Sequence, residues 1–141
     1  MFITFEGIEG SGKSTQIQLL KEFFEKKAQK AFFTKEPGSS EVGKKIRSIL
    51  LNKENKISPQ TEIFLIFADR VQHVREIIKP NLNEGKIVIS DRYYDSSIAY
   101  QGQREGVDKT EIYELINMLD LPTPDITLSL IHISEPTRQE A

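Results

Sequence analysis

The stretch that decides the fold is Gly7-Ile8-Glu9-Gly10-Ser11-Gly12-Lys13-Ser14, which matches the phosphate-loop pattern G-x-x-x-x-G-K-[ST] at every fixed position. The apolar, β-prone residues 2–5 precede it and predict a buried strand. Residues 15–24 follow it and predict a helix, with one apolar face made by Leu19, Leu20, Phe23 and Phe24. Because the motif has the strand before it and the helix after it that it requires, an ordinary glycine-rich turn is the weaker alternative.

The residue types in this loop suit the binding of a polyphosphate. Glycines let successive backbone N–H groups point at a phosphate, and the following helix adds its positive N-terminal end. Lys13 can reach the β- and γ-phosphates, and the Ser14 hydroxyl can join the ligand shell of Mg²⁺. The loop therefore predicts a site for a nucleoside triphosphate and magnesium.

Length, charge and composition limit the possible classes of protein. A chain of 141 residues predicts one domain, and a net charge of −2 argues against nucleic acid or a membrane as the main partner. Cysteine is absent, which excludes disulfides and thiolate metal sites. No apolar run is long enough to span a bilayer, and the first residues lack the pattern of a signal peptide, so we expect a cytoplasmic protein.

Predicted strands and helices alternate along the rest of the chain. Further strands are predicted at residues 31–34, 87–91 and 126–128, and helices begin after Ser39 or Ser40, at Ser58-Pro59 and at residue 110. Pro80 is expected to kink or end the helix that begins at Pro59. This alternation predicts an α/β fold with a parallel sheet, helices on both faces, and ligands beyond the carboxyl ends of the strands.

The apolar faces of the two middle helices follow from helical spacing. The first is predicted to bury Val42, Ile46, Ile49 and Leu50, and the second to bury Phe64, Phe67, Ala68, Val71 and Val74. His73 lies in a polar stretch of the second helix, and we expect it to be solvated.

Several polar residues outside the loop are candidates for a site. Asp91 ends an apolar strand, where it can hold magnesium or cap the next segment. Arg92 can bind a phosphate bidentately or pair with a carboxylate. Arg47 and Arg70 are each either ligands or solvated helix charges. Glu9 either points to solvent or accepts a hydroxyl of a second substrate.

No nucleophile–base pair is apparent in the sequence, and this is compatible with phosphoryl transfer. A phosphate acceptor has its second pKa near ~6 and needs no general base at neutral pH. Catalysis then depends on positioning and on charge neutralisation.

Six segments together resemble the bacterial thymidylate kinase (dTMP kinase) family, in matching order and spacing over residues 1–128. They are F-E-G-I-E-G-S-G-K-S-T at 5–15, K-E-P-G at 35–38, G-K-K-I-R-S-I-L-L at 43–51, F-A-D-R at 67–70, S-D-R-Y-Y-D-S-S-I-A-Y-Q-G at 90–102 and P-D-I-T-L at 124–128. The resemblance implies a P-loop nucleoside-monophosphate-kinase fold, usually a homodimer. It also implies transfer of the ATP γ-phosphate to dTMP, giving dTDP for dTTP synthesis, with Mg²⁺.

The resemblance assigns roles to individual residues. Lys13, Asp91 and Arg92 would be catalytic, and Ser14 and Asp91 would hold the metal. ATP would be bound by Gly7, Ile8, Glu9, Gly10, Ser11, Gly12, Lys13, Ser14 and Thr15.

The implied dTMP site draws on residues from the whole chain. Glu9 would contact the sugar 3′-hydroxyl, Arg47 and Arg92 the phosphate, Arg70, Ser97 and Gln101 the base, and Tyr100 the ribose 2′ position. Pro37 would follow a cis peptide bond. Phe67 is our choice for the aromatic that stacks on the base, because Ile66 stands where the family has phenylalanine. Lys35 also departs from the family, which usually has arginine there.

The resemblance ends at residue 128. Residues 129–141 look like a translated sequencing adapter, so we expect residues 1–128 to form an incomplete kinase domain and the tail to be artefactual. The C-terminal elements and lid arginines of the family would then be missing, and the chain would be poorly stable and weakly active. The alternatives are a P-loop kinase for another nucleoside monophosphate or a deoxynucleoside, and a non-catalytic nucleotide-binding fragment.

Overall fold

A parallel sheet forms the centre of the molecule. The computed structural model describes residues 1–8 and 10–130. Its strands are β1 (Phe2–Glu6), β2 (Ala31–Lys35), β3 (Ile87–Asp91) and β4 (Ile126–Ser129). Every pairing is parallel, in the order β2-β3-β1-β4. The predicted α/β fold with a parallel sheet is therefore confirmed.

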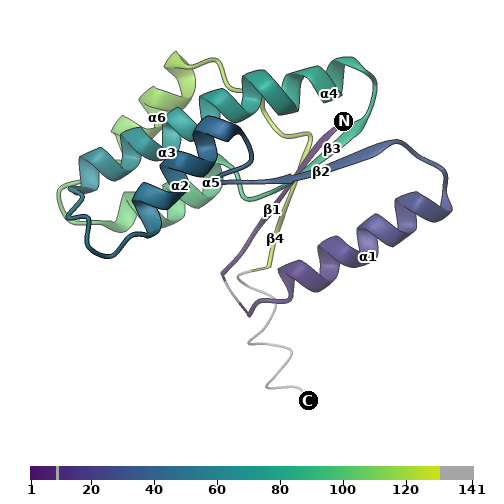
Figure 1. Ribbon diagram of the computed structural model, residues 1–141, viewed down its shortest axis with the longest axis horizontal. Coiled ribbons are helices and arrows are strands. Elements are labelled where there is room, and N and C mark those ends of the chain that lie inside the picture. The colour runs from purple at the N-terminus through teal and green to yellow at the C-terminus, as the bar shows by residue number, and fades with distance from the viewer. Residues whose placement is uncertain (9, 131–141) are drawn as a thin grey trace.

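Helices cover both faces of this sheet, as predicted (Figure 1). The helix α1 (Lys13–Lys26) lies on one side, and the other helices gather on the opposite side. They are α2 (Glu41–Leu51), α3 (Pro59–His73), α4 (Lys79–Asn83), α5 (Tyr94–Tyr100) and α6 (Lys109–Met118), with a π-helical turn at Val74–Ile78 and a 3-10 turn at Gln101–Gln103. Within the described ranges, no helix is long and apolar enough to cross a membrane.

The alternation of side chains along the strands produces two hydrophobic cores. Phe2 and Val88 point to the multi-helix side, where they join Phe67 of α3 and Ile112 of α6. On the opposite face, β1 and β3 pack against α1, through a cluster of Ile3, Phe5, Ile89 and Phe24. Both central strands are therefore covered on both faces, as their continuous apolar character requires.

Serine hydroxyls cap the N-termini of two helices, as the sequence predicts. Ser40 Oγ accepts a hydrogen bond from the Gly43 N–H at 2.8 Å, which identifies Ser40 rather than Ser39 as the cap of α2. Ser58 Oγ accepts from the Thr61 N–H at 3.1 Å, and Pro59 follows as the first residue of α3. These caps satisfy backbone donors that have no partner within the helix.

The predicted apolar faces of three helices are partly wrong. Leu19 and Phe23 of α1 are about half exposed, and Ile17 and Leu20 pack with the buried Phe24 instead. Exposed apolar residues elsewhere are Val42 and Ile49 of α2 and Phe64 and Ala68 of α3. Each helix carries more apolar surface than the sheet can cover, and spacing alone does not say which part of it is covered.

Pro80 does not end the helical path, which was one of the two predicted outcomes; the other, a kink, stays a prediction. The π-helical turn Val74–Ile78 comes just before it, and the helical path continues to Asn83. In this turn the Lys79 N–H bonds to the Val74 carbonyl, five residues back. A proline ring crowds the carbonyl four residues before it, and the wider turn accommodates that crowding.

The described part of β4 runs one residue beyond the predicted domain boundary. Ser129 lies opposite Glu6 in the ladder, and the Leu130 N–H donates to the Glu6 carbonyl at 3.0 Å. Residues 131–141, including His132, lie outside the described residues. The prediction that residues 129–141 are foreign to the domain stays a prediction.

We expect Ile112→Ala to lower the free energy of unfolding by about 2–5 kcal/mol, because Ile112 is fully buried in the larger core. Urea unfolding followed by circular dichroism measures this change. Asn117→Ala is the control, since Asn117 is exposed on the same helix and its loss should cost about 0.5 kcal/mol or less. Equal losses in the two variants would contradict the assigned core.

Candidate functional site

Strand register brings the candidate residues to one edge of the sheet. Asp91, at the end of β3, lies opposite Phe5 of β1 and Lys35 of β2. The phosphate loop leaves β1 at this same edge and enters α1. Two adjoining cavities open here, of about 560 and about 460 Å³.

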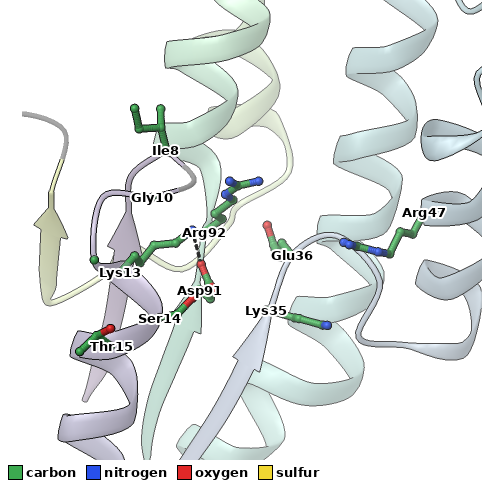
Figure 2. A pocket seen from close by; sticks show the side chains of 11 residues that line it. Ile8, Gly10, Lys13, Ser14, Thr15, Lys35, Glu36, Arg47, Asp91 and Arg92 are labelled. Carbon is green, nitrogen blue, oxygen red and sulfur yellow. Dashed lines mark ion pairs between the residues drawn. The ribbon is translucent and has the colours of Figure 1, made fainter.

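The phosphate loop forms a wall of the first cavity (Figure 2). Gly10 and Gly12 have φ angles of 79° and 89°. Residues other than glycine rarely adopt such positive φ angles. Gly12 precedes the first residue of α1, so the loop delivers Lys13 and Ser14 at the positive end of that helix. The cavity is lined by Ile8, Gly10, Gly12, Lys13, Ser14, Thr15, Lys35, Glu36, Arg47, Asp91 and Arg92.

Most of the predicted ATP-binding residues therefore line one cavity. Gly7 and Ser11 do not line it, and Glu9 lies outside the described residues. A Cβ added at Gly7 would lie 2.8 Å from Ser11 Oγ, so that hydroxyl would have to turn away. Ser11 Oγ is itself buried with no hydrogen-bond partner in the described structure.

Lys13 and Asp91 form an ion pair across the first cavity. Lys13 Nζ lies 2.6 Å from Asp91 Oδ1, and the lysine is 7% exposed (Figure 2). The pair places a cation beside the phosphate loop and a carboxylate opposite it. Lys13, Asp91 and Arg92, the three residues predicted to be catalytic, thus all line the cavity that the loop defines.

The backbone at Arg92 is held in an uncommon conformation. Its φ of 73° is rare for a residue with a side chain. The Arg92 N–H donates to the Phe5 carbonyl and the Ser90 hydroxyl donates to the Arg92 carbonyl, both at 2.8 Å. Arg92 Nε is buried with no partner within the described structure. These hydrogen bonds fix the backbone of Arg92, which lines both cavities. The Nε–H of its guanidinium is then available to donate to a ligand.

The donor set fits a magnesium ion bound together with a nucleotide. The Ser14 hydroxyl and the Asp91 carboxylate both line the first cavity, and Mg²⁺ prefers oxygen ligands. Within residues 1–8 and 10–130, no group of three or more His, Asp or Glu side chains could hold a metal without other ligands. Magnesium usually keeps several waters and phosphate oxygens, so two protein oxygens are sufficient.

The second cavity brings together most of the predicted dTMP-binding residues. Pro37, Arg47, Arg70, Arg92, Ser97, Tyr100 and Gln101 line it, with Ile8, Glu36, Leu50, Leu51, Glu62, Ile66, Asp69 and Ser96. The peptide bond between Glu36 and Pro37 is cis, as predicted. Arg47 Nη1 donates to the Pro37 carbonyl at 3.0 Å, which fixes the arginine against this turn.

Among the described residues of the predicted dTMP site, Phe67 is the exception, and its predicted role needs correction. It is 2% exposed, belongs to the larger core and does not line the second cavity. The Arg70 guanidinium packs over its ring, with the central carbon 4.9 Å from the ring centroid. Ile66 lines the cavity instead. Helical geometry causes this difference, because one residue along a helix turns the side chain by about 100°.

A network of buried polar side chains lies behind the second cavity, and the sequence did not predict it. His73, predicted to be solvated, is fully buried; its Nδ1 lies 2.7 Å from Glu36 Oε2 and its Nε2 lies 2.6 Å from Thr34 Oγ1. Arg70 Nε donates to Glu36 Oε1 at 2.7 Å, and Arg70 Nη1 donates to Ser97 Oγ at 2.9 Å. Among the polar side chains of residues 72–76, Arg75 and Glu76 are exposed and only His73 is buried, a difference that periodicity cannot predict.

Charge pairing decides the ionisation of Glu36. Burial alone would raise its pKa, but the Arg70 guanidinium and the hydrogen bond from His73 outweigh this effect, and the pKa lies below its usual range. Asp69 also lies in this region and accepts a hydrogen bond from the Gly38 N–H at 3.1 Å. Its pKa is raised by burial and by the charge of Glu36.

Glu6 is a further buried carboxylate that the sequence did not indicate. Its Oε1 accepts from the Tyr93 N–H at 2.8 Å and its Oε2 accepts from the Ser96 hydroxyl, so it joins the end of β1 to the start of α5. Burial raises its pKa to about 7, although both hydrogen bonds act in the opposite direction. Unlike Glu36, it has no ion-pair partner among the described residues.

The raised pKa of Glu6 predicts a loss of stability as the pH rises. Between its ordinary pKa of 4.5 and about 7, the folded chain binds more protons at this carboxyl than the unfolded chain does. The contribution of Glu6 to the free energy of unfolding should therefore fall by about 3 kcal/mol over this range. Urea unfolding at pH 5 and pH 8 should show this fall in the parent and much less of it in Glu6→Gln.

Glu22→Gln is the matched control for this experiment, because Glu22 is exposed on α1. It should keep the pH dependence of the parent. A parent and a Glu6→Gln variant with the same change in stability between the two pH values would refute the role of burial at Glu6.

Comparison with known proteins agrees with this geometry. The profile of the family described as thymidylate kinase matches residues 5–139. Thymidylate kinases from Maridesulfovibrio salexigens and Halothermothrix orenii are 48% and 47% identical to this chain over 132 residues; each match covers 92% of this chain, and 61% and 63% of the relative. The crystal structure of thymidylate kinase from Ehrlichia chaffeensis superposes with a TM-score of 0.84 at 42% identity, covering 92% of this chain and 75% of that one.

These relatives also show how much of the family the chain represents. It spans somewhat less than two thirds of the length of the first two relatives. The family profile, the sequence identity and the fold agree, and the chain belongs to the thymidylate kinase family.

Proposed function

We propose that the protein phosphorylates dTMP to dTDP with ATP, in the synthesis of dTTP. The observation that carries this proposal is the junction of the two cavities. Both are lined by Ile8, Glu36, Arg47 and Arg92. A triphosphate on the loop and a monophosphate in the second cavity would therefore approach each other beside two guanidinium groups.

The side chains at this junction suit phosphoryl transfer between two phosphates. Lys13 would neutralise the β- and γ-phosphates, and Arg92 and Arg47 would bind the phosphate of dTMP. An ionised acceptor phosphate needs no base, in keeping with the predominance of cations around the junction. Magnesium, held with the nucleotide by Ser14 and Asp91, would supply further charge neutralisation.

The rest of the second cavity would receive the nucleoside. Arg70, Ser97 and Gln101 offer hydrogen-bond donors and acceptors to a base. Tyr100, 39% exposed at the cavity wall, would lie near the ribose and disfavour a 2′-hydroxyl. Glu9, proposed for the 3′-hydroxyl, lies outside the described residues.

Isothermal titration of the chain with ATP and dTMP tests the assignment of the two cavities. We expect Lys13→Met to weaken ATP binding by about tenfold or more, the loss typical of a charged hydrogen bond, while dTMP binding changes little. Lys21→Met is the control, because Lys21 is exposed on the same helix away from the loop. Equal weakening of both ligands in a folded Lys13→Met variant would refute separate sites.

We also propose that the protein acts as a homodimer in the cytoplasm, where its nucleotide substrates would be found. The helices α2, α3 and α6 lie on the same side of the sheet (Figure 1) and carry exposed apolar side chains. These are Val42, Ile49 and Leu51 of α2, Phe64 of α3, and Tyr113 and Met118 of α6. An apolar surface of this kind suits contact with a second copy.

Phe64→Asp should shift the chain from dimer to monomer in sedimentation velocity, because Phe64 is 64% exposed on this surface and lines a cavity together with Met118 of α6. Leu19→Asp is the matched control: Leu19 is 53% exposed on α1, across the sheet, and its replacement should leave the dimer intact. A monomeric parent, or dissociation by both variants alike, would contradict the proposed interface.

A further inference from the structure

We propose that His73 is a positioning residue for base selection: it holds Glu36, and Glu36 holds the Arg70 guanidinium at the wall of the second cavity. The inference rests on the proposed function in that the cavity receives the base of the acceptor. His73 is fully buried and is not among the described residues that line the cavity, so it would act only through its neighbours.

Both ring nitrogens of His73 are engaged. An ionised Glu36 carboxylate can only accept, so Nδ1–H of His73 donates to Oε2 over the 2.7 Å that separates them. On the other side of the ring, Nε2 lies 2.6 Å from Thr34 Oγ1 in β2. The ring is thereby fixed between α3, the strand β2 and the turn that follows it.

Glu36 transmits this fixed orientation to Arg70. Its second oxygen, Oε1, accepts from Arg70 Nε at 2.7 Å. A carboxylate held at both oxygens cannot rotate about its terminal bond. Without the bond from His73, only the bond to Arg70 would remain among the contacts of the described structure, and the two groups could turn together.

The other contacts of Arg70 leave part of its guanidinium free for a ligand. Nη1 donates to Ser97 Oγ at 2.9 Å, and the flat group packs over the rings of Phe67 and Tyr93. A guanidinium has five N–H donors and no acceptor. Its unused donors at the cavity wall suit a carbonyl oxygen and oppose an amino group. A fixed Arg70 therefore favours thymine, with its carbonyl, over cytosine, with its exocyclic amine.

A merely structural role for His73 makes a different prediction from a positioning role. Loss of a buried polar group in the core would weaken both ligands together, through loss of folded protein. Loss of positioning would change the preference between dTMP and dCMP and change ATP binding much less, because Arg70 and His73 do not line the first cavity in the described structure and Glu36 is the one member of the network that does.

The test uses titration of the full 141-residue chain with dTMP, dCMP and ATP. We expect His73→Phe to reduce the dTMP-over-dCMP affinity ratio by about tenfold, with the ATP dissociation constant changed by about twofold or less. His73→Asn keeps a donor near the position of Nδ1 and should restore most of the ratio. Thr34→Val is the matched control, because it removes the other partner of the ring and leaves the bond to Glu36.

A second measurement requires no ligand. The Arg70 Nε–H resonance, assigned with Arg70→Lys, reports the bond to Glu36, and its exchange with water should be about tenfold faster in His73→Phe than in the parent or in His73→Asn. A folded His73→Phe with an unchanged affinity ratio would overturn the proposal, as would parallel losses of ATP and dTMP binding.

If the parent chain does not bind dTMP, the proposed function is wrong, and the exchange measurement then decides the positioning role. Unchanged exchange in His73→Phe overturns it, and faster exchange supports it.

Discussion

The parallel pairing of β1 with β3 is the constraint on which the site depends. It places Phe5 opposite Asp91, so the phosphate loop and the segment Asp91-Arg92 leave the sheet side by side. The backbone bond from Arg92 to Phe5 continues this pairing beyond the strand and fixes Arg92 in its left-handed conformation. Lys13 of α1 can then pair with Asp91 although 78 positions separate them in the chain. A shift of this register would separate the loop from its partner residues.

Two buried glutamates show how partners control charge at this edge of the sheet. Glu36 and Glu6 are similarly buried, at 6% and 4% exposure. Glu36 lies against the Arg70 guanidinium, which together with His73 lowers its pKa below the usual range, whereas Glu6 receives only neutral hydrogen bonds and its pKa rises to about 7. The difference follows from the partner, because an opposite charge stabilises a buried carboxylate more than a neutral donor does. The acceptor side thus keeps a fixed negative charge that orients Arg70.

The two cavities share a boundary made of residues from four separate segments. Ile8 comes from the phosphate loop, Glu36 from the turn after β2, Arg47 from α2 and Arg92 from the segment after β3. Gly38, with a φ of 102°, allows the turn to pass close to Arg47; a Cβ there would lie 2.7 Å from Arg47 Cδ. The backbone conformations at Gly38 and Arg92, and the hydrogen bond from Arg47 to the Pro37 carbonyl, therefore hold the two arginines, which suits them for binding phosphates in one orientation.

The local sequence determined the elements and much of the site. The phosphate loop, a serine cap at position 39 or 40, the cap at Ser58 and the strand that ends at Asp91 depend on neighbouring residues and on a regular period, so they could be predicted. The site residues at 35–47 and 90–102 were found because those motifs keep the pattern of a known family. Spacing could not decide which apolar stripe of a helix is covered, and so Leu19, Val42, Ile49 and Phe64 were wrongly placed in the core.

Only the tertiary structure decided the interior. Whether a polar side chain such as His73 or Glu6 faces solvent or a buried partner depends on residues 37 and 87 positions away, and no local pattern carries that information. The same holds for Phe67, whose place behind Arg70 rather than in the cavity is set by how α3 is rotated against the sheet. The sequence by itself determined which chemistry the chain contains, because motif and residue type are local. The tertiary structure decided which groups are buried together, because burial and pairing arise from contacts between distant segments.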